Sequence, residues 1–352
     1  MASFLLRRLA DGLLVLLGVA LTVFGLFAVL PGDPAALLAG QRTDEATRAA
    51  IRADLGLDKP LPEQLGRYLN DLAPVSVHAD TPANRARYGY VRLLGVGNGR
   101  ALVLKAPYLR RSFQSQRPVL VILLDHLPGT AVLALAALAL AAVVGIGLGV
   151  VAALRPYGWL DQTLLATSVL GISVPSFVAA IFIALTLGFY WAPWTGLPLT
   201  GQLVEIDPFT GPHVVWRNLV LPALALGIRP LAVITQLTRS SLLDVLRQDY
   251  IRTARAKGLS TRQVVVRHAL RNALNPVITA VSGWLASLLA GAFFIEYIFN
   301  WKGLGAVTLR AVENLDFPVV MGATLFVAGL FVVVNILVDV LYAALDPRVK
   351  LA

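Results

Sequence analysis

The sequence predicts an all-α membrane protein, and three observations lead to this class. Of the 352 residues, 57% are hydrophobic and only 14% are charged. The mean hydropathy is +0.73, outside the range of ordinary soluble domains. Six stretches are also long and apolar enough to cross a bilayer, which takes about 20 residues per helix.

The six expected transmembrane helices are separated by loops of very unequal length. Their approximate bounds are Leu9–Leu30, Pro128–Leu154, Thr163–Tyr190, Leu219–Val245, Val277–Ile298 and Val319–Leu345. The first follows Arg7 and Arg8, as in a signal peptide, but its apolar run is longer than a typical h-region and no convincing cleavage site follows. We therefore expect an uncleaved anchor.

The distribution of basic residues predicts the orientation. Residues 239–275 contain eight Lys or Arg and two Asp, whereas the short loops on the opposite side contain few basic residues. The positive-inside rule places the basic insert and both termini in the cytoplasm. The segment Pro31–Arg117 carries 13 basic residues, but long loops translocate largely regardless of charge. The net charge of +10 is therefore interpreted as topology signal and lipid contact, not as nucleic-acid binding.

The long segment between the first two spans has local structure of its own. A capping threonine, early acids and Gly56 predict a helix over residues 43–57. Asn98 and Gly99 between apolar runs predict a β-hairpin. The glycines around it do not form a P-loop, so the chain itself is not expected to bind ATP. The absence of cysteine excludes disulfides and thiolate metal sites.

The basic insert, Asp249–Pro276, predicts two short helices joined by a tight turn. Gly258 favours the left-handed conformation that ends a helix, and Ser260 with Gln263 forms a capping box that starts the next. In the second helix, helical spacing predicts an apolar face at residues 266, 270, 273, 274 and 277. Such an elbow either lies against lipid through its basic side chains or docks on a partner.

The insert resembles the cytoplasmic EAA loop of ABC-importer permeases, in the form found in oligopeptide, dipeptide and nickel systems. The resembling stretch is YIRTARAKGLSTRQVVVRHALRNALNPVIT. Further stretches agree in order over nearly the full length: FLLRRL, LPGDPA, LGLDKPLPEQLGRYL, RSFQSQRPV, GISVPSF, LVLPALALG, LTRSSLLDVL, EYIFNWKGLG, LDFPVVMG and DVLYAALDPRV.

This resemblance implies a type I ABC-importer permease fold, with a long extracytoplasmic insert between the first two helices. The implied organisation is an anchor (1–30), an extracytoplasmic segment (31–118), a core permease domain (119–345) and a cytoplasmic tail (346–352). The implied partners are a second homologous permease, two ATPase subunits that hold ATP and Mg²⁺, and an extracytoplasmic substrate-binding protein. No cofactor, metal site or catalytic residue is expected on this chain, which is not an enzyme.

By position, the coupling helix that docks on an ATPase subunit lies within Asp249–Leu259. The coupling residues implied by the resemblance are Tyr250, Thr253, Ala254, Arg255, Ala256, Lys257, Gly258 and Leu259. Arg252 stands where the general EAA pattern begins with Glu, which removes a simple acidic contact. The small residues at 253, 254 and 256 are expected to let this helix enter a groove.

Candidate residues for the translocation path lie inside the third and fourth spans. Arg229 sits near mid-membrane, where a charge usually faces a cavity or a partner. It either meets a carboxylate or backbone carbonyl of the solute, or it snorkels along its kinked helix or bonds to carbonyls that Pro230 frees. Pro175, flanked by Ser173 and Ser176, predicts a kink, either at the path or purely structural.

The loop after the fifth span carries aromatic residues and glycines. The resemblance implies an external gate that contacts the binding protein, whereas the simpler interpretation is an interfacial aromatic belt. The candidate gate residues are Glu296, Tyr297, Phe299, Trp301, Gly303 and Gly305.

Other classes of function fit less well. The four histidines are scattered, no HExxH or GxSxG motif occurs, and the spans hold no carboxylate pair, which disfavours an intramembrane enzyme. A channel or proton-coupled carrier would keep ionisable relays at mid-membrane, where Arg229 is nearly alone. We expect a bacterial inner-membrane permease for short peptides that works by alternating access. Nickel or another metal chelate, a glycoside or a peptide-like antibiotic remains an alternative solute.

Overall fold

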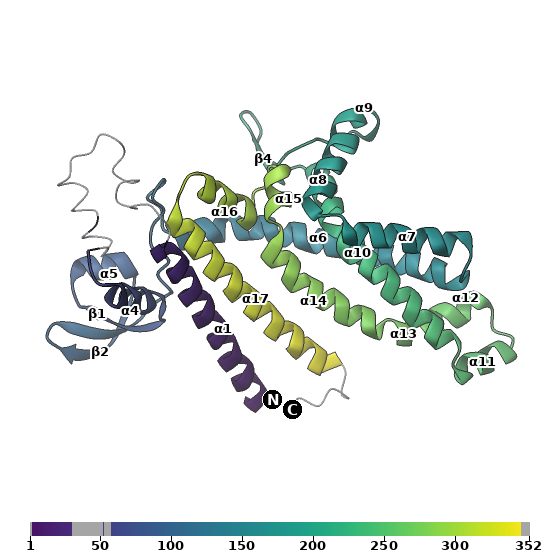
Figure 1. Cartoon of the computed structure of the whole chain (residues 1–352), viewed down its shortest axis with the longest axis horizontal. Coiled ribbons are helices and arrows are strands. Elements are labelled where there is room, and N and C mark those ends of the chain that lie inside the picture. Colours follow the sequence, from purple (N-terminus) through teal and green to yellow (C-terminus); the bar gives the residue numbers. More distant parts are fainter. Residues whose placement is uncertain (1, 30–51, 53–57, 346–352) are drawn as a thin grey trace. The chain divides into compact units, whose positions relative to one another are not determined.

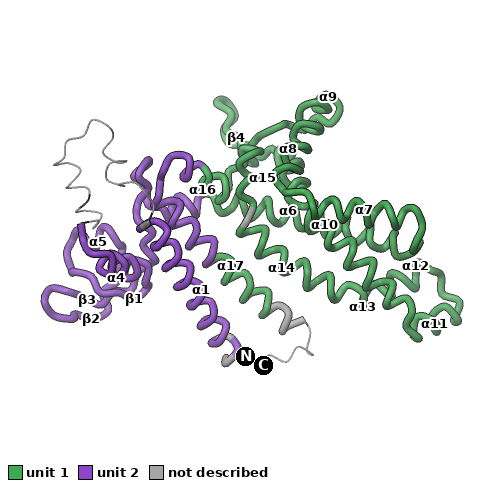
Figure 2. The backbone as a smooth tube through the Cα atoms, viewed as in Figure 1, with its two compact units in different colours: residues 1, 126–309, 330–352 green, residues 2–125, 310–329 purple. Residues whose placement is uncertain are grey.

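The computed structural model describes residues 2–29, 52 and 58–345. Two compact units make up the chain: residues 2–125 with 310–329, and residue 1 with 126–309 and 330–352 (Figure 2). The helix expected over residues 43–57 and the tail from residue 346 lie outside the described residues, apart from Arg52.

The first unit contains the long helix α1 (Ala2–Val29) and a small α/β subdomain. The segment between α1 and α6 (Val119–Leu154) contains a three-stranded antiparallel sheet in the order β1-β3-β2. The elements in this unit are α1 (Ala2–Val29), α4 (Leu61–Leu72), β1 (Val75–Ala79), α5 (Pro82–Tyr88), β2 (Val91–Gly97) and β3 (Arg100–Leu104). Asn98 and Gly99 both have positive φ between β2 and β3, which confirms the predicted hairpin.

Long apolar helices dominate the rest of the chain (Figure 1). Helices α6 and α17 begin in one unit and end in the other. The remaining elements are α6 (Val119–Leu154), α7 (Trp159–Ser173), α8 (Ser176–Leu185), the π-helix η1 (Thr186–Tyr190), α9 (Ala192–Thr195), β4 (Val204–Asp207), β5 (Gly211–Val214), α10 (Arg217–Leu246), α11 (Asp249–Ala256), α12 (Thr261–Gln263), the π-helix η2 (Val264–Ala269), α13 (Leu270–Ala273), α14 (Asn275–Gly291), α15 (Phe293–Ile298), α16 (Leu304–Glu313) and α17 (Phe317–Leu345).

Among the described residues, four helices are long and apolar enough to cross a membrane, and two bent helix pairs raise the number to six if each pair is one span. The four are within α1, α6, α10 and α17. The third predicted span, Thr163–Tyr190, is formed by α7, α8 and η1, and its bend lies at Pro175, where the sequence predicts a kink. The helix breaks at Val174 and Pro175, where its axis bends by 109°. The fifth predicted span ends early, because α14 stops at Gly291 and α15 starts separately.

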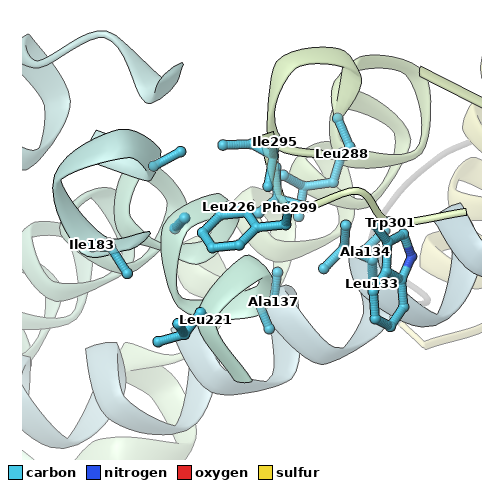
Figure 3. Packing of buried hydrophobic residues seen from close by; sticks show 14 of the residues in the cluster. Leu133, Ala134, Ala137, Ile183, Leu221, Leu226, Leu288, Ile295, Phe299 and Trp301 are labelled. Atoms are coloured by element: carbon cyan, nitrogen blue, oxygen red, sulfur yellow. The ribbon is translucent and has the colours of Figure 1, made fainter. Parts of the chain in front are cut away.

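Close packing around α10 forms the core of the larger unit. Phe299, Trp301, Leu133 and Leu221 are nearly inaccessible there, together with alanines from α6, α8 and α10 (Figure 3). Glycines let α6 and α10 approach, since a Cβ on Gly149 would lie 2.5 Å from Thr238 Cβ. This is the small-residue packing that brings membrane helices together.

Candidate functional site

The basic insert folds into a compact elbow between α10 and α14. Helix α11 ends at Ala256, Gly258 has φ +78°, and the capping box of Ser260 and Gln263 opens α12. All three features follow the sequence prediction. A buried apolar cluster holds the elbow together; it includes Leu242, Ile251, Ala254, Val264, Val265, Ala269 and Ala273.

Helix α11 has an inner and an outer face. Ile251 and Ala254 are 0% and 7% exposed and pack into the elbow's own cluster. Thr253, Arg255, Ala256, Lys257 and Gly258 are exposed, and Leu259 is half-buried. The bare outer face is short, basic and lined by small residues, whereas Ala254 serves the packing of this chain.

Tyr250 ties the two arms of the elbow together. Its hydroxyl accepts a hydrogen bond of 2.9 Å from Asn272 Nδ2, although the Tyr250 side chain is 41% exposed. This hydrogen bond between residues 22 positions apart holds α11 against α13. The elbow can therefore move as one piece.

The apolar face predicted for the second arm is partly wrong. Val266 is 61% exposed, and the buried positions are Val264, Val265, Ala269, Ala273 and Val277. Residues 264–269 form a π-helix, which has more residues per turn than an α-helix. The extra residue shifts the face by one position, so Val265 replaces Val266 in the core.

The break between α7 and α8 brings together the residues expected in the translocation path. Ser173 ends α7, Pro175 precedes α8, and Ser176 begins α8. Arg229 of α10 donates a long hydrogen bond of 3.4 Å to the backbone carbonyl of Ile172. The last carbonyls of a helix lack intrahelical partners, so the break itself creates this acceptor.

Arg229 remains exposed despite this contact, while Pro230 beside it is buried. The hydroxyl of Ser173 donates to the carbonyl of Val169 within its own helix, at 2.8 Å. The carbonyl that Arg229 contacts belongs to Ile172 of α7, so it is not one that Pro230 frees in α10. The guanidinium has five N–H donors, and the bond to Ile172 uses one nitrogen, so the group keeps capacity for an anion.

The loop predicted as the external gate, Glu296–Pro318, is called the external loop below, and it is built around a buried carboxyl group. Glu296 is fully buried, and its oxygens accept hydrogen bonds from the Thr130 hydroxyl (2.6 Å) and from the amides of Gly305 (2.7 Å) and Ala306 (3.1 Å). The same Thr130 hydroxyl accepts from the amide of Leu304 at 2.8 Å. Glu296 and Thr130 thus satisfy the first amides of α16, which a helix N-terminus leaves unpaired.

Most of the predicted gate residues are interior ones. Phe299 and Trp301 are each 1% exposed, Gly303 and Gly305 are buried, and only Tyr297 is exposed, at 40%. The indole nitrogen of Trp301 donates to the carbonyl of Gly129 at 2.9 Å (Figure 3 shows Trp301 in the core). The alternative of an interfacial aromatic belt is therefore wrong for Phe299 and Trp301, which pack into the protein.

Sequence reasoning missed two sets of contacts between distant segments. Thr130 and Gly129 on α6 receive the external loop, and a Cβ on Gly129 would lie 1.8 Å from the carbonyl oxygen of Lys302. Asp161 pairs with Arg239, 78 positions away in the chain. No local pattern marks such contacts between distant segments. Among the described residues there is no group of three or more His, Asp or Glu that could hold a metal ion.

Comparison with known proteins gives a consistent result over the whole chain. Residues 145–351 match the family of binding-protein-dependent transport system inner membrane components, and residues 1–134 match the N-terminal part of such membrane components. A putative peptide transport system permease protein of Brucella abortus is 40% identical over 99% of both chains. The dipeptide transport system permease protein of Escherichia coli K12 is 34% identical over 99% of both chains.

A solved structure also resembles this fold. The MetNI methionine ABC transporter, in inward-facing conformations, contains a chain that superposes with a TM-score of 0.51 and 16% sequence identity. The superposition covers 64% of this chain and 97% of that chain.

Proposed function

The chain belongs to the family of binding-protein-dependent transport system inner membrane components, and we propose that it forms part of the path through which an ABC importer carries short peptides. It is a multi-pass inner-membrane protein in that family. The peptide assignment is supported by relatives that share 34–40% identity over their full length and are named for peptide or dipeptide transport.

The observation that carries the mechanism is the elbow. An element whose inner face packs on its own chain and whose outer face is bare transmits force from a partner to the helices on either side. Here those helices are α10 and α14. The outer face offered to the partner comprises Thr253, Arg255, Ala256, Lys257 and Gly258, with Tyr250 and Leu259 at its margins.

The proposed partners are those that membership of this family implies. Two ATPase subunits bind ATP and Mg²⁺ beneath the membrane, one docking on this elbow and one on a second, homologous permease. An extracytoplasmic binding protein delivers the peptide. Closure of the ATPase subunits displaces the elbow, and alternating access follows as α10 and α14 move. The basic elbow and both termini lie in the cytoplasm, in line with the positive-inside rule.

Arg229 supplies the chemical contact with the solute. Every unmodified peptide ends in a carboxylate, and a guanidinium binds a carboxylate through two parallel hydrogen bonds. Arg229 is exposed and is held at the α7–α8 break by the carbonyl of Ile172. Ser173 and Ser176 lie at the same break and line the path beside it.

The test is import by the complete complex in proteoliposomes, with a labelled dipeptide outside and ATP inside. Arg229→Ala and Arg229→Lys are compared with the wild type at equal amounts of inserted protein. We expect import to fall in both, more in Arg229→Ala, because lysine keeps the charge without the bidentate geometry. Full import by both variants would remove Arg229 from the path, and import of a metal chelate without any peptide would overturn the assigned substrate.

A further inference from the structure

Helix α7 is joined to α10 near both of its ends. At its start, Asp161 forms a bidentate ion pair with Arg239, in which Arg239 Nη2 lies 2.6 Å from Asp161 Oδ2. The same carboxylate accepts a hydrogen bond of 2.8 Å from the amide of Tyr157, in the turn before α7. At its end, the carbonyl of Ile172 accepts the bond from Arg229.

Close packing supports the second attachment. A Cβ on Gly171 would lie 3.2 Å from Ile228 Cγ2 and 3.5 Å from Ala232 Cβ. The absence of a side chain at Gly171 therefore lets α7 lie directly on α10 near the long Arg229 bond. Helices α7 and α10 are in contact, with Asp161 and Arg239 paired near one end of α7 and Ile172 and Arg229 near the other.

The two attachments match in spacing. They are eleven residues apart on α7 and ten apart on α10, which at about 1.5 Å per residue gives nearly equal lengths of about 15–17 Å on antiparallel helices. Two attachments at equal spacing favour movement of the two helices together over sliding or hinging of one on the other.

The ion pair is costly to break. The Asp161 side chain is 1% exposed and that of Arg239 is 16% exposed. Separating them would leave a buried carboxylate without its partner, which is strongly unfavourable. Because breaking the pair is unfavourable, it favours motion of α7 together with α10.

We propose that Asp161 and Arg239 are positioning residues that hold α7 against α10, and we call this attachment the yoke. Through it, displacement of the α11 elbow reaches the α7–α8 break as a rigid movement. Arg239 lies ten residues before α11 on the same continuous chain segment, and the α7–α8 break lies at the far end of the yoke. The inference rests on the proposed function, since it concerns how the elbow's movement reaches the path.

The decisive experiment is a cross-link between the two helices. Gly171→Cys with Ala232→Cys places two Cβ atoms at a separation suited to a disulfide, and the chain contains no other cysteine. The complete complex is oxidised in proteoliposomes, cross-linking is measured by loss of free thiols, and dipeptide import is compared before and after reduction. Each single-cysteine variant is the matched control.

A yoke that stays closed predicts the same import rate in the oxidised and reduced double variant. Loss of import on oxidation, restored by reductant and absent from the single-cysteine controls, would show that α7 must leave α10 and would overturn the proposal. Stimulation of ATP hydrolysis by the loaded binding protein is a second readout. A wild-type complex that shows this stimulation but imports no peptide contradicts the proposed substrate, while the cross-link still tests the yoke.

Asp161→Asn tests the positioning role without a cross-link. Asparagine keeps the shape of Asp161 and removes the charge. We expect transport per ATP hydrolysed to fall by about tenfold, within the usual range of coupling between distant sites. Arg239→Lys should give a smaller loss, because it keeps the charge but not the two-point geometry. If Asp161→Asn leaves the ratio of transport to ATP hydrolysis unchanged, or lowers assembly, hydrolysis and transport equally, the pair has only a structural role.

Discussion

The elbow and the external loop carry comparable sequence signals but have opposite structures. Each is a short helical excursion between membrane helices, and the family resemblance assigns each to a partner. In the elbow, the residues assigned to docking are mostly exposed. In the external loop, five of the six assigned residues are buried, and the exposed residue is Tyr297. A motif can therefore mark either a contact surface or the anchor that holds one in place.

The physical cause of the difference lies in the polar groups. In the elbow, the capping box and the turn at Gly258 satisfy the backbone groups at the helix ends. The side chains of its outer face are therefore not needed for the fold. The external loop instead satisfies the start of α16 with Glu296 and with Thr130 from α6. That solution needs a buried carboxyl group, and the residues around it become core.

Replacing Glu296 with alanine should have the largest effect. The amides of Gly305 and Ala306 and the hydroxyl of Thr130 would lose their acceptor inside the protein, at a cost of about 3 kcal/mol or more in the free energy of unfolding. Unfolding of the purified chain in detergent measures the loss. Tyr297→Ala is the control, with a change of about 0.5 kcal/mol or less. Equal stability of the two variants would contradict the proposed role of Glu296 in holding the loop.

Alanine at Gly303 should also destabilise the loop. Its Cβ would lie 2.3 Å from the carboxyl carbon of Glu296, and overpacking of this kind costs about 1–3 kcal/mol. Gly283 in α14 is the matched control, because its Cβ would meet nothing within 4 Å. There alanine should stabilise the helix by about 0.5–1 kcal/mol. The two unfolding curves should shift in opposite directions, and a shift of both in one direction would break the comparison.

Two alanines of α11 separate docking from packing in the elbow. Leucine at Ala254 enters the buried cluster and should cost about 1–2 kcal/mol in stability. Leucine at Ala256 points to the bare face, so stability should change by about 0.5 kcal/mol or less while copurification of the ATPase subunit falls. Full assembly and transport with Ala256→Leu would remove the docking role from that face.

Local signals in the sequence predicted local structure well. The hairpin at Asn98 and Gly99, the turn at Gly258 and the capping box at Ser260 each depend on a few neighbouring residues. Pro175 predicted a kink but not its 109° angle, because the bend also depends on what receives the freed carbonyl of Ile172. The π-helix at 264–269 likewise has no sequence signature in its apolar spacing.

Contacts between distant segments could not be predicted from the sequence. Aromatic residues in a loop favour a membrane interface or a core equally, and only the packing on α6 decides for Trp301. Asp161 and Arg239 are separated by 78 positions, and each is an unremarkable polar residue near the end of an apolar helix. Their pairing follows from the way α7 folds back onto α10.

A modest loss of stability is expected at Gly258, where the elbow turns. An L-residue in the left-handed conformation costs about 1–2 kcal/mol, and asparagine tolerates it better than alanine. No atom lies within 4 Å of a Cβ there, so the cost is one of backbone conformation and not of a clash. Gly258→Ala should therefore lower the unfolding temperature more than Gly258→Asn. If both variants are equally stable, the angle between α11 and α12 is not held by this turn, and the buried cluster alone would make the elbow rigid.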